Sequence, residues 1–225
     1  MKLLCMSDIH CEFDSFKAEV SIRKTDKVDL CIVAGDLTNW GLRKPKEVAE
    51  AAAFLSWLST LMSVVWIPGN HDVGINEAGD AISQLVLPKR ECSNILNKTM
   101  NFQGITAHGV SLTTCFDKSR LTDTFDHMTA DRGRESAVFG ALPTVDVLVS
   151  HGPPYGLLDR SGDRWNSLNK EWEDVHLGSP ALREYMDTKH PKLIVCGHVH
   201  ESAGERTFGQ TRIVNCARQV AEVEI

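Results

Sequence analysis

The stretch Val64-Val65-Trp66-Ile67-Pro68-Gly69-Asn70-His71-Asp72 decides how this chain folds. Four apolar residues lead to a Pro-Gly break, and Asn, His and Asp follow at once. A β-branched apolar run that ends at Pro-Gly predicts a buried strand leading into a polar loop. In open α/β proteins, ligands bind at the carboxyl ends of such strands. The stretch therefore predicts a strand over 64–67 whose trailing loop carries part of a site.

Four further stretches repeat this design. Each follows an apolar run and places Asp or His directly after it. They are Ser7-Asp8-Ile9-His10, Gly35-Asp36, Ser150-His151-Gly152 and Gly197-His198-Val199-His200. One such loop is weak evidence, because a single polar residue after a strand is common. Five of them in one chain predict a single polar site that is assembled from five strand ends.

Strand and helix patterns alternate in both halves of the chain. The predicted strands are 2–6, 28–34, 64–67, 145–149 and 192–196, with short strands in 94–114 broken at Gly104 and Gly109, and two or three closing strands in 206–225. The predicted helices are 15–24, 46–61, 77–85, part of 125–139, and a helix that Ser179-Pro180 starts and that runs to about 188. This order predicts an α/β fold, a four-layer α-β-β-α sandwich in which two packed mixed sheets carry the site at their strand ends.

The length of 225 residues predicts one domain, 1–225. The hydrophobic fraction of 42% and the charged fraction of 24% are those of an ordinary soluble protein. The chain has 24 Lys and Arg against 30 Asp and Glu, a formal net charge of -6, and no basic tract. Nucleic acid is therefore not the favoured partner, although bound cations would supply positive charge locally.

The cellular compartment is predicted from what the chain lacks. No apolar run approaches the roughly 18 residues that span a bilayer, so no membrane association is expected. The apolar stretch at the N-terminus is too short for a signal peptide, and Asp8 interrupts it. The seven Cys are scattered and form no C-x-x-C pair, which is typical of a reducing, cytoplasmic location.

The chemistry follows from the residue types at the five strand ends. They comprise two carboxylates, one amide and four imidazoles: Asp8, Asp36, Asn70, His10, His151, His198 and His200. These are too many ligands for one first-row metal and about right for two. Mixed carboxylate and imidazole ligands suit Mn, Fe, Zn or Ni, and not Ca. Two metals ~3.5–4 Å apart hold a bridging hydroxide and clamp phosphoryl oxygens, so in-line attack on a phosphoester is expected.

His71 is the eighth polar group of this set. It directly follows the candidate ligand Asn70, and adjacent side chains in extended structure point in opposite directions. We therefore expect His71 to lie beside the metals, where it donates to a phosphoryl oxygen or to the leaving group.

The five stretches resemble the signature of the calcineurin-like metallophosphoesterases, D-x-H, G-D, G-N-H-[DE], a lone H after a strand, and G-H-x-H, in the same order. The resemblance implies the two-sheet sandwich and two divalent metal ions, with Mn first and Fe, Zn or Ni as alternatives. It assigns Asp8, His10, Asp36 and His200 to one metal. It assigns Asp36, Asn70, His151 and His198 to the other, with Asp36 as the bridge. It also makes His71 the catalytic histidine, which Asp72 would orient.

Departures from the signature narrow the branch of the family. Phosphoprotein phosphatases carry G-D-x-V-D-R-G, and here Asn39 and Trp40 take the places of the second Asp and the Arg. The intact 197–201 stretch (GHVHE), and Gly178-Ser179 before the last helix, look more like the small phosphodiesterase branch. The 151–156 stretch (HGPPYG) also resembles a branch described as cyclic-nucleotide-type phosphodiesterases. This resemblance implies hydrolysis of a small, nucleotide-like phosphodiester. A nuclease or a phosphomonoesterase with the same chemistry, and a non-catalytic scaffold on this fold, are the alternatives.

Substrate choice is expected in two rim segments, 37–45 and 152–178. The second is predicted to be the longest segment without regular structure, and loops of this length in compact domains are often functional. It carries three candidate substrate-binding residues, Arg160, Arg164 and His176. The arginines would grip a phosphate or a base, or they are solvated loop charges. The sequence leaves the oligomeric state open.

Overall fold

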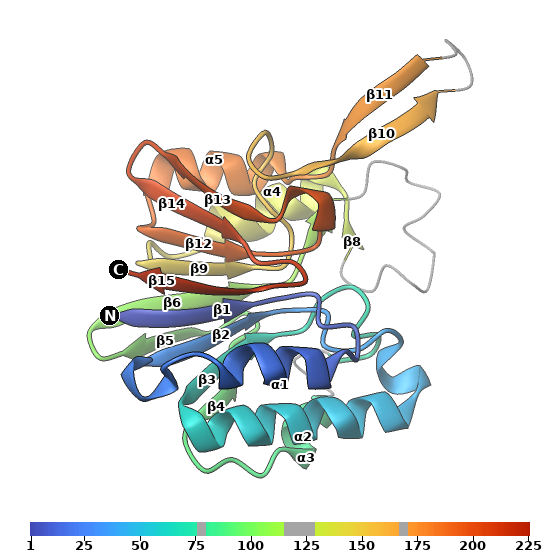
Figure 1. The fold of residues 1–225 in the computed structure, drawn as a ribbon. Coiled ribbons are helices and arrows are strands. Elements are labelled where there is room, and N and C mark those ends of the chain that lie inside the picture. The colour runs from blue at the N-terminus through green and yellow to red at the C-terminus, as the bar shows by residue number, and fades with distance from the viewer. Residues whose placement is uncertain (76–79, 115–128, 167–170) are drawn as a thin grey trace.

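Two sheets lie face to face between two layers of helices in a computed structural model of the chain (Figure 1). It describes residues 1–75, 80–114, 129–166 and 171–225, without the side chains of 129 and 163–174. The predicted α-β-β-α sandwich with two mixed sheets is confirmed. Among the described residues, no helix is both long and apolar enough to cross a bilayer.

The first sheet has the strand order β15-β1-β2-β3-β4. Its strands are β1 (Lys2–Met6), β2 (Leu30–Ala34), β3 (Ser63–Ile67), β4 (Cys92–Asn94) and β15 (Val220–Glu224). The pairs β1–β2, β2–β3 and β3–β4 are parallel, and β15 runs antiparallel to β1. Because parallel strands end at the same edge, the loops after β1, β2 and β3 meet there.

The second sheet has the strand order β13-β14-β12-β9-β6-β5. Its strands are β5 (Thr99–Phe102), β6 (Ile105–Val110), β9 (Val147–Ser150), β12 (Leu193–Cys196), β13 (Gly204–Phe208) and β14 (Thr211–Asn215). The four central strands are parallel, and β5 and β13 are antiparallel edge strands. The loops after β9 and β12 therefore also share one edge. A separate parallel pair joins β7 (Thr113–Thr114) and β8 (Thr129–Ala130).

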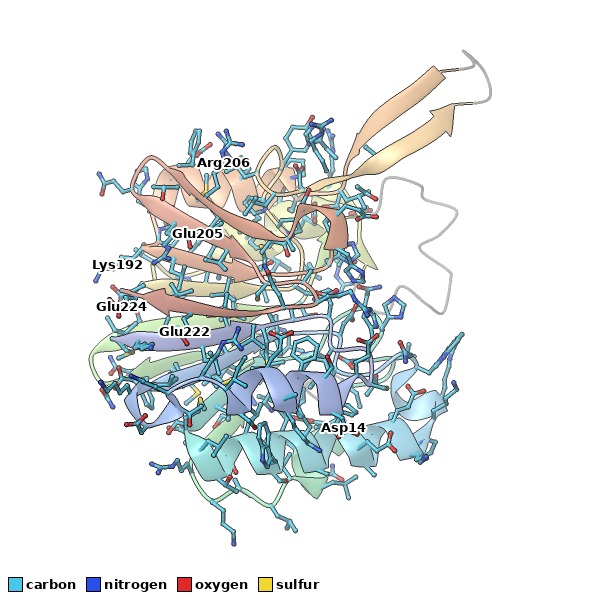
Figure 2. The ribbon with its side chains drawn as sticks, in the orientation of Figure 1. Asp14, Lys192, Glu205, Arg206, Glu222 and Glu224 are labelled. Atoms are coloured by element: carbon cyan, nitrogen blue, oxygen red, sulfur yellow. The ribbon has the colours of Figure 1, made fainter. Side chains whose placement is uncertain are left out.

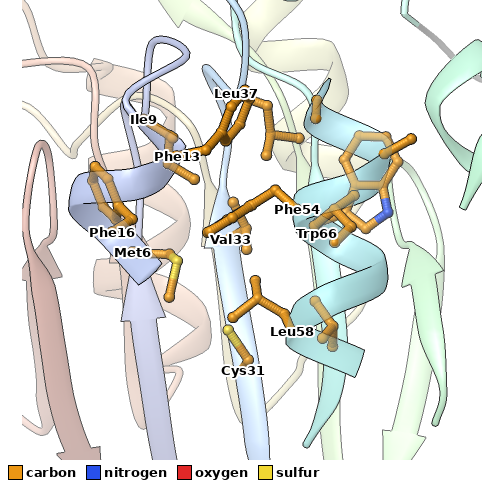
Figure 3. Close-up of a cluster of buried hydrophobic side chains, with 14 of the residues drawn as sticks. Met6, Ile9, Phe13, Phe16, Cys31, Val33, Leu37, Phe54, Leu58 and Trp66 are labelled. Atoms are coloured by element: carbon orange, nitrogen blue, oxygen red, sulfur yellow. The ribbon is translucent and has the colours of Figure 1, made fainter. Parts of the chain in front are cut away.

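The alternation of side chains along the strands fills two separate cores. In β1, Leu3 and Cys5 face the second sheet, and Leu4 and Met6 face the helices. The helices over the first sheet are α1 (Phe13–Ser21), α2 (Pro45–Leu61) and α3 (Ala81–Leu85). Figure 3 shows aromatic side chains of α1 and α2 packed on the strands from this side. Every residue of β2 is buried, as expected for a central strand that is covered on both faces.

Two helices, α4 (Arg132–Ala141) and α5 (Pro180–Lys189), cover the outer face of the second sheet. The predicted start of α5 is confirmed, because the Ser179 hydroxyl accepts from the backbone N–H of Leu182 at 3.1 Å. The predicted helices over 77–85 and in part of 125–139 are confirmed in part. Helix α3 begins at Ala81 and α4 at Arg132, and positions 76–79 and 115–128 lie outside the described residues.

The predicted strand break at Gly109 is wrong, because Gly109 lies inside β6. A Cβ atom at this position would lie 2.5 Å from Cγ2 of Ile67 and 2.6 Å from the carbonyl oxygen of Ile95. Gly109 therefore does not form a turn. It allows β6 to pack closely against neighbouring backbone, which is another reason for glycine to occur inside a strand.

The prediction that 152–178 lacks regular structure is also wrong for much of the segment. Strands β10 (Arg160–Asn166) and β11 (Glu171–His176) pair antiparallel, with Trp165 opposite Trp172. Figure 1 shows this hairpin extending away from the sandwich. A ribbon that extends from the body has no face to bury in the core. Its sequence therefore lacks the apolar alternation by which strands are predicted.

Candidate metal centre

Backbone hydrogen bonds hold four of the five predicted strand ends side by side, in two pairs. The N–H of Asp8 donates to the carbonyl of Gly35 at 3.0 Å, and the N–H of His10 donates to that of Asp36 at 3.0 Å. Across the second sheet, the N–H of Gly197 donates to the carbonyl of His151 at 2.9 Å. These contacts bring the loops after β1, β2, β9 and β12 to one edge of the sandwich.

Several residues of this edge have left-handed backbone conformations. The φ angles are 55° at Asp8, 47° at His10, 53° at Asp36 and 69° at His198. Positive φ is uncommon for residues other than glycine, and such strain concentrates at functional sites. Asp8 and His10 therefore converge through a turn. His71 likewise lies in a turn.

One group of metal donors consists of Asp8, His10 and His200, whose potential ligand atoms lie within 4.8 Å of one another. Nε2 of His200 is 3.0 Å from Oδ1 of Asp8, and Nε2 of His10 is 3.9 Å from the same oxygen. Nε2 of His10 also lies 3.7 Å from Oδ2 of Asp36. Asp8, His10, Asp36 and His200 thus lie together.

A second group surrounds His151. Its Nε2 lies 2.9 Å from Oδ1 of Asn70 and 3.3 Å from Oδ2 of Asp36. The ring of His198 packs against that of His151, with their centroids 5.3 Å apart. Asp8, Asp36 and His151 also have potential ligand atoms within 4.8 Å of one another, so Asp8 belongs to both sets of close donors. Oδ2 of Asp36 in turn lies near His10 of the first group and near His151 of the second. Each of the seven predicted ligands lies in or against at least one of the two groups.

The protonation of His151 indicates that this second group fits a cation. Its Nδ1 lies 2.8 Å from the carbonyl oxygen of Ala34, and because a carbonyl only accepts, Nδ1 carries a proton. In the neutral ring, the Nε2 lone pair would then face two oxygens, those of Asn70 and Asp36. Burial lowers the pKa of His151, but the charge and hydrogen bond of Asp36, the charge of Asp8 and the bond to Ala34 together outweigh it and raise the pKa to about 10. A proton on Nε2, or a metal ion in its place, would satisfy Nε2 and the two oxygen atoms of Asn70 and Asp36.

The two buried carboxylates remain ionised in this environment. Burial raises the pKa of Asp8, but the hydrogen bond with His200 and the charge of His151 hold it below its usual value. For Asp36, burial is likewise outweighed by the charge and hydrogen bond of His151, so its pKa is also low. Burial and the charge of His151 lower the pKa of His198 to about 4, which leaves a neutral imidazole. Anionic carboxylates and a neutral imidazole are metal-binding forms.

Two glycines allow the loops to approach these carboxylates. A Cβ atom at Gly69 would lie 2.2 Å from Oδ1 of Asp36. A Cβ atom at Gly197 would lie 2.2 Å from Oδ2 of Asp8. Any larger residue would displace a carboxylate oxygen, so both glycines of the sequence motifs serve the site directly.

The comparison with known proteins agrees with this donor set. Residues 1–202 match the family described as calcineurin-like phosphoesterase. The chain belongs to this family. It is therefore a metal-dependent phosphoesterase, and its family model covers all the strand ends described above.

Relatives of this phosphoesterase come from distant organisms. It is 30% identical over 224 residues to an uncharacterized protein of Methanocaldococcus jannaschii, with 96% of this chain and 87% of the relative covered. It is 26% identical over 242 residues to metallophosphoesterase domain-containing protein 1 of Homo sapiens, with 96% and 65% covered. The crystal structure of TT1561 of Thermus thermophilus shares the fold, with a TM-score of 0.64, 16% identity, and 96% and 88% covered. Another solved structure has a TM-score of 0.71, 16% identity, and 96% and 90% covered.

In this phosphoesterase, His71 lies next to the first donor group. Its ring packs edge-on against that of His10, with the centroids 4.9 Å apart. Its backbone N–H donates to Oδ1 of Asp36 at 2.8 Å. Nδ1 of His71 lies 3.2 Å from the carbonyl oxygen of Asn39. His71 therefore lies beside the first donor group, and the Asn39 carbonyl is the hydrogen-bond partner of its Nδ1.

Asp72 has a different set of contacts from the predicted one. Its carboxylate accepts from the backbone N–H groups of Leu37, Thr38 and Gly69 at 3.1, 2.8 and 2.9 Å, and from the Thr38 hydroxyl at 2.7 Å. These bonds tie the loop after β2 to the loop after β3. Burial and the charge of Asp36 raise the pKa of Asp72 to about 6. The prediction that Asp72 orients His71 is corrected. The hydrogen bond at Nδ1 of His71 is made with the Asn39 carbonyl, and Asp72 instead holds the loops after β2 and β3 together.

The substrate-side candidates lie at the base of the hairpin. Arg160 is exposed at the start of β10, opposite His176 in the ladder, and its carbonyl accepts from the Ser202 hydroxyl at 2.6 Å. Ser202 belongs to the short 3-10 helix η4 (His200–Ser202), so the hairpin base is tied to a donor loop. Nδ1 of His176 lies 2.8 Å from Oδ1 of the buried Asp159. The side chain of Arg164 lies outside the described part of the chain.

Sequence reasoning missed two residues of this site. Asn39 was noted only as a departure from a phosphatase motif, and its contact with His71 is made by a backbone carbonyl, which has no sequence signature. The other is Arg218, whose backbone N–H donates to the carbonyl of Ser7 at 3.0 Å, one residue before Asp8. Its position depends on the turn between β14 and β15, and nothing in the local sequence marks it.

Proposed function

We propose that this protein is a phosphodiesterase that hydrolyses a small, nucleotide-like phosphoester with two divalent metal ions, Mn first among the candidates. The observation that carries the proposal is the position of Asp36 Oδ2, which lies 3.7 Å from His10 Nε2 and 3.3 Å from His151 Nε2. A carboxylate oxygen between two sets of donors fits a bridge between two ions.

The donor sets assign the ligands. Asp8, His10, Asp36 and His200 would hold one ion, and Asp36, Asn70, His151 and His198 would hold the other. Such a pair of ions supplies a hydroxide nucleophile at neutral pH and neutralises charge on the phosphoryl group. The chain's own residues bind the ester, orient it and provide the proton.

His71 is the proposed hydrogen-bond donor to the reacting phosphoester. Because the Asn39 carbonyl engages Nδ1, Nε2 is the ring nitrogen that we propose for the substrate. Protonated at Nε2, the ring donates to a phosphoryl oxygen or to the leaving-group oxygen. Asp72 keeps the loops of Asp36 and His71 in register through its bonds to Leu37, Thr38 and Gly69. On the substrate side we propose His176, held by Asp159, with Arg160 and Arg164.

The decisive experiment compares bis(p-nitrophenyl) phosphate with p-nitrophenyl phosphate, using metal-stripped protein and added Mn. We expect Mn to restore hydrolysis of the diester, and Asp36→Asn to lower it by about 10²-fold or more because a proposed bridge is lost. The control is Asp14→Asn, a carboxylate on α1 that is fully exposed and pairs only with Lys17 at 3.4 Å among the described residues (Figure 2).

Each other outcome selects an alternative. Hydrolysis of the monoester alone would replace the proposal by a phosphomonoesterase, and rapid cleavage of single-stranded DNA or RNA would replace it by a nuclease. Metal binding without hydrolysis of any of these esters would favour a scaffold. The single domain and the cytoplasmic location stay predictions from the sequence.

A further inference from the structure

Arg218 lies beside the candidate metal centre, and the proposed mechanism does not use it. It belongs to the turn between β14 and β15. Ala217 forms an isolated bridge with Ser7, and the N–H of Arg218 donates to the Ser7 carbonyl at 3.0 Å. The next residue after Ser7 is Asp8. The turn thus holds the backbone of Arg218 directly against the first donor loop.

The conformation of this turn is fixed from both sides. Arg218 has a φ of 56°, a left-handed value that costs energy for a residue with a side chain. The N–H of Cys216 donates to the carbonyl of Cys196 at 2.8 Å, at the end of β12, which precedes His198 and His200. The turn is therefore clamped between the loop of Asp8 and the loop of His200, and the strained residue is an arginine.

The guanidinium group of Arg218 forms an ion pair with Glu12, two residues after His10. The two side chains are 42% and 51% exposed. Arg218 thus places a half-exposed positive charge against the donor loop, with its backbone at Ser7, next to Asp8, and its guanidinium at Glu12, two residues after His10.

We propose that Arg218 binds a second anionic group of the substrate, and that this group displaces Glu12 from the guanidinium. The inference rests on the proposed phosphodiesterase function and adds a substrate class, namely phosphodiesters that carry a further phosphate or carboxylate. A guanidinium fork matches the oxygens of a phosphate, and the bond is charge-assisted. An exposed ion pair contributes little to stability, so Glu12 is readily exchanged.

Two chromogenic esters with the same leaving group test this recognition. They are thymidine 5′-(p-nitrophenyl phosphate) and its 3′-phosphorylated form, which differ only in the second anion. We expect the wild-type protein to have a lower KM for the 3′-phosphorylated ester. The Arg218→Gln variant should reduce the ratio of the two KM values by about tenfold, since a charge-assisted hydrogen bond to phosphate is lost. Arg218→Lys should restore part of the ratio.

Two further variants separate recognition from a structural role. Glu12→Gln removes the competing carboxylate and should increase the preference for the 3′-phosphorylated ester. Arg212→Gln is the matched control, because Arg212 pairs with Glu205 at 2.6 Å in β13 and β14, away from the donor loops, and should leave the ratio unchanged.

Equal effects of Arg218→Gln on both esters, or an unchanged ratio, would overturn the inference and leave Arg218 as a structural residue of the turn. If the wild-type protein hydrolyses neither ester, the proposed function fails separately. Equilibrium binding of the two intact esters to the wild-type and Arg218→Gln proteins then decides the role of Arg218.

Discussion

The backbone carbonyl oxygen of Asn39 lies 3.2 Å from Nδ1 of His71. A carbonyl oxygen can only accept a hydrogen bond, so this contact fixes the proton of the neutral ring on Nδ1. A backbone group holds the ring here, and the carboxylate of Asp72 is engaged by the N–H groups of Leu37, Thr38 and Gly69. Among the described residues, the hydrogen-bond partner of Nδ1 is therefore a main-chain carbonyl and not a titratable side chain. The orientation of the His71 ring does not depend on the protonation of that partner.

The first prediction concerns this histidine. His71→Asn removes the group that donates to the substrate, and kcat for bis(p-nitrophenyl) phosphate should fall by about 10²–10⁴-fold. The metal content, measured by atomic emission, should remain that of the wild-type protein, because His71 is not one of the proposed ligands. A variant that loses its metal along with its activity would make His71 a ligand and contradict the assignment.

The second prediction concerns the close approach of Gly69 to Asp36. Gly69→Ala would place a Cβ atom 2.2 Å from Oδ1 of Asp36 and should weaken Mn binding by about tenfold or more, as disturbed ligand-orienting contacts do. Gly140→Ala in α4 is the control, because its added Cβ would have no atom within 4 Å beyond its chain neighbours and the backbone of its own helix. That change should be neutral or stabilise the protein by up to about 1 kcal/mol. Isothermal titration with Mn measures both, and equal affinities would contradict the prediction.

The third prediction concerns metal and stability. A ligand that binds only the folded state stabilises it, by about 2.7 kcal/mol at 100 times its Kd. Chelation followed by addition of Mn should therefore raise the Tm of the wild-type protein. In His151→Ala the rise should be much smaller, since one proposed ligand is missing. Differential scanning fluorimetry makes the comparison, and a Tm that responds to none of Mn, Fe, Zn and Ni would argue against the metal centre.

The fourth prediction concerns pH and an ion pair at the far edge of the sheets, near the labelled Lys192 in Figure 2. Nζ of Lys192 lies 2.8 Å from Oδ1 of Asp146, and Thr106 donates two hydrogen bonds of 2.8 Å to Oδ2. The bond from Lys192 and those from Thr106 lower the pKa of Asp146 from 3.8 to about 2. Because the unfolded state binds the proton first, this stabilisation is present above about pH 4 and is lost as the pH falls from there to about 2.

Urea unfolding of wild-type protein and Asp146→Asn at pH 6 and pH 3 measures this effect. The free energy of unfolding should differ by about 1 kcal/mol at pH 6, after allowance for the partly exposed side chain, and by less at pH 3. A difference that is the same at both pH values would show that Asp146 acts through packing and not through its charge.

The ligand set could be predicted from the sequence because it obeys a simple geometric rule. Residues that directly follow parallel strands meet at one edge of a sheet, so Asp36 after β2 and His198 after β12 can be placed without coordinates. The rule depends on buried strands, whose apolar runs are easily seen. It says nothing of backbone conformation, and the left-handed turns at Asp8 and His10 came only from the structure.

The parts that could not be predicted depend on contacts without a residue signature. The hairpin of β10 and β11 extends from the sandwich and therefore shows no apolar alternation. Gly109 resembles a turn residue in sequence, but its role is to permit close packing against Ile67. The contact of Asn39 with His71 uses a main-chain atom, and Arg218 reaches the site through a turn near the other end of the chain.

One hydrogen bond of the candidate metal centre joins two residues that lie far apart in the sequence. The backbone N–H of His198 donates to Oδ2 of Asp8 at 2.9 Å, across 190 positions of sequence. Contacts between such distant residues form slowly, because the intervening chain must first be ordered. A nascent chain on the ribosome therefore cannot assemble both donor groups until β12 has emerged and docked. Metal binding would then follow the last steps of folding. A chain truncated before β12 would lack part of both donor groups and would have no phosphoesterase activity.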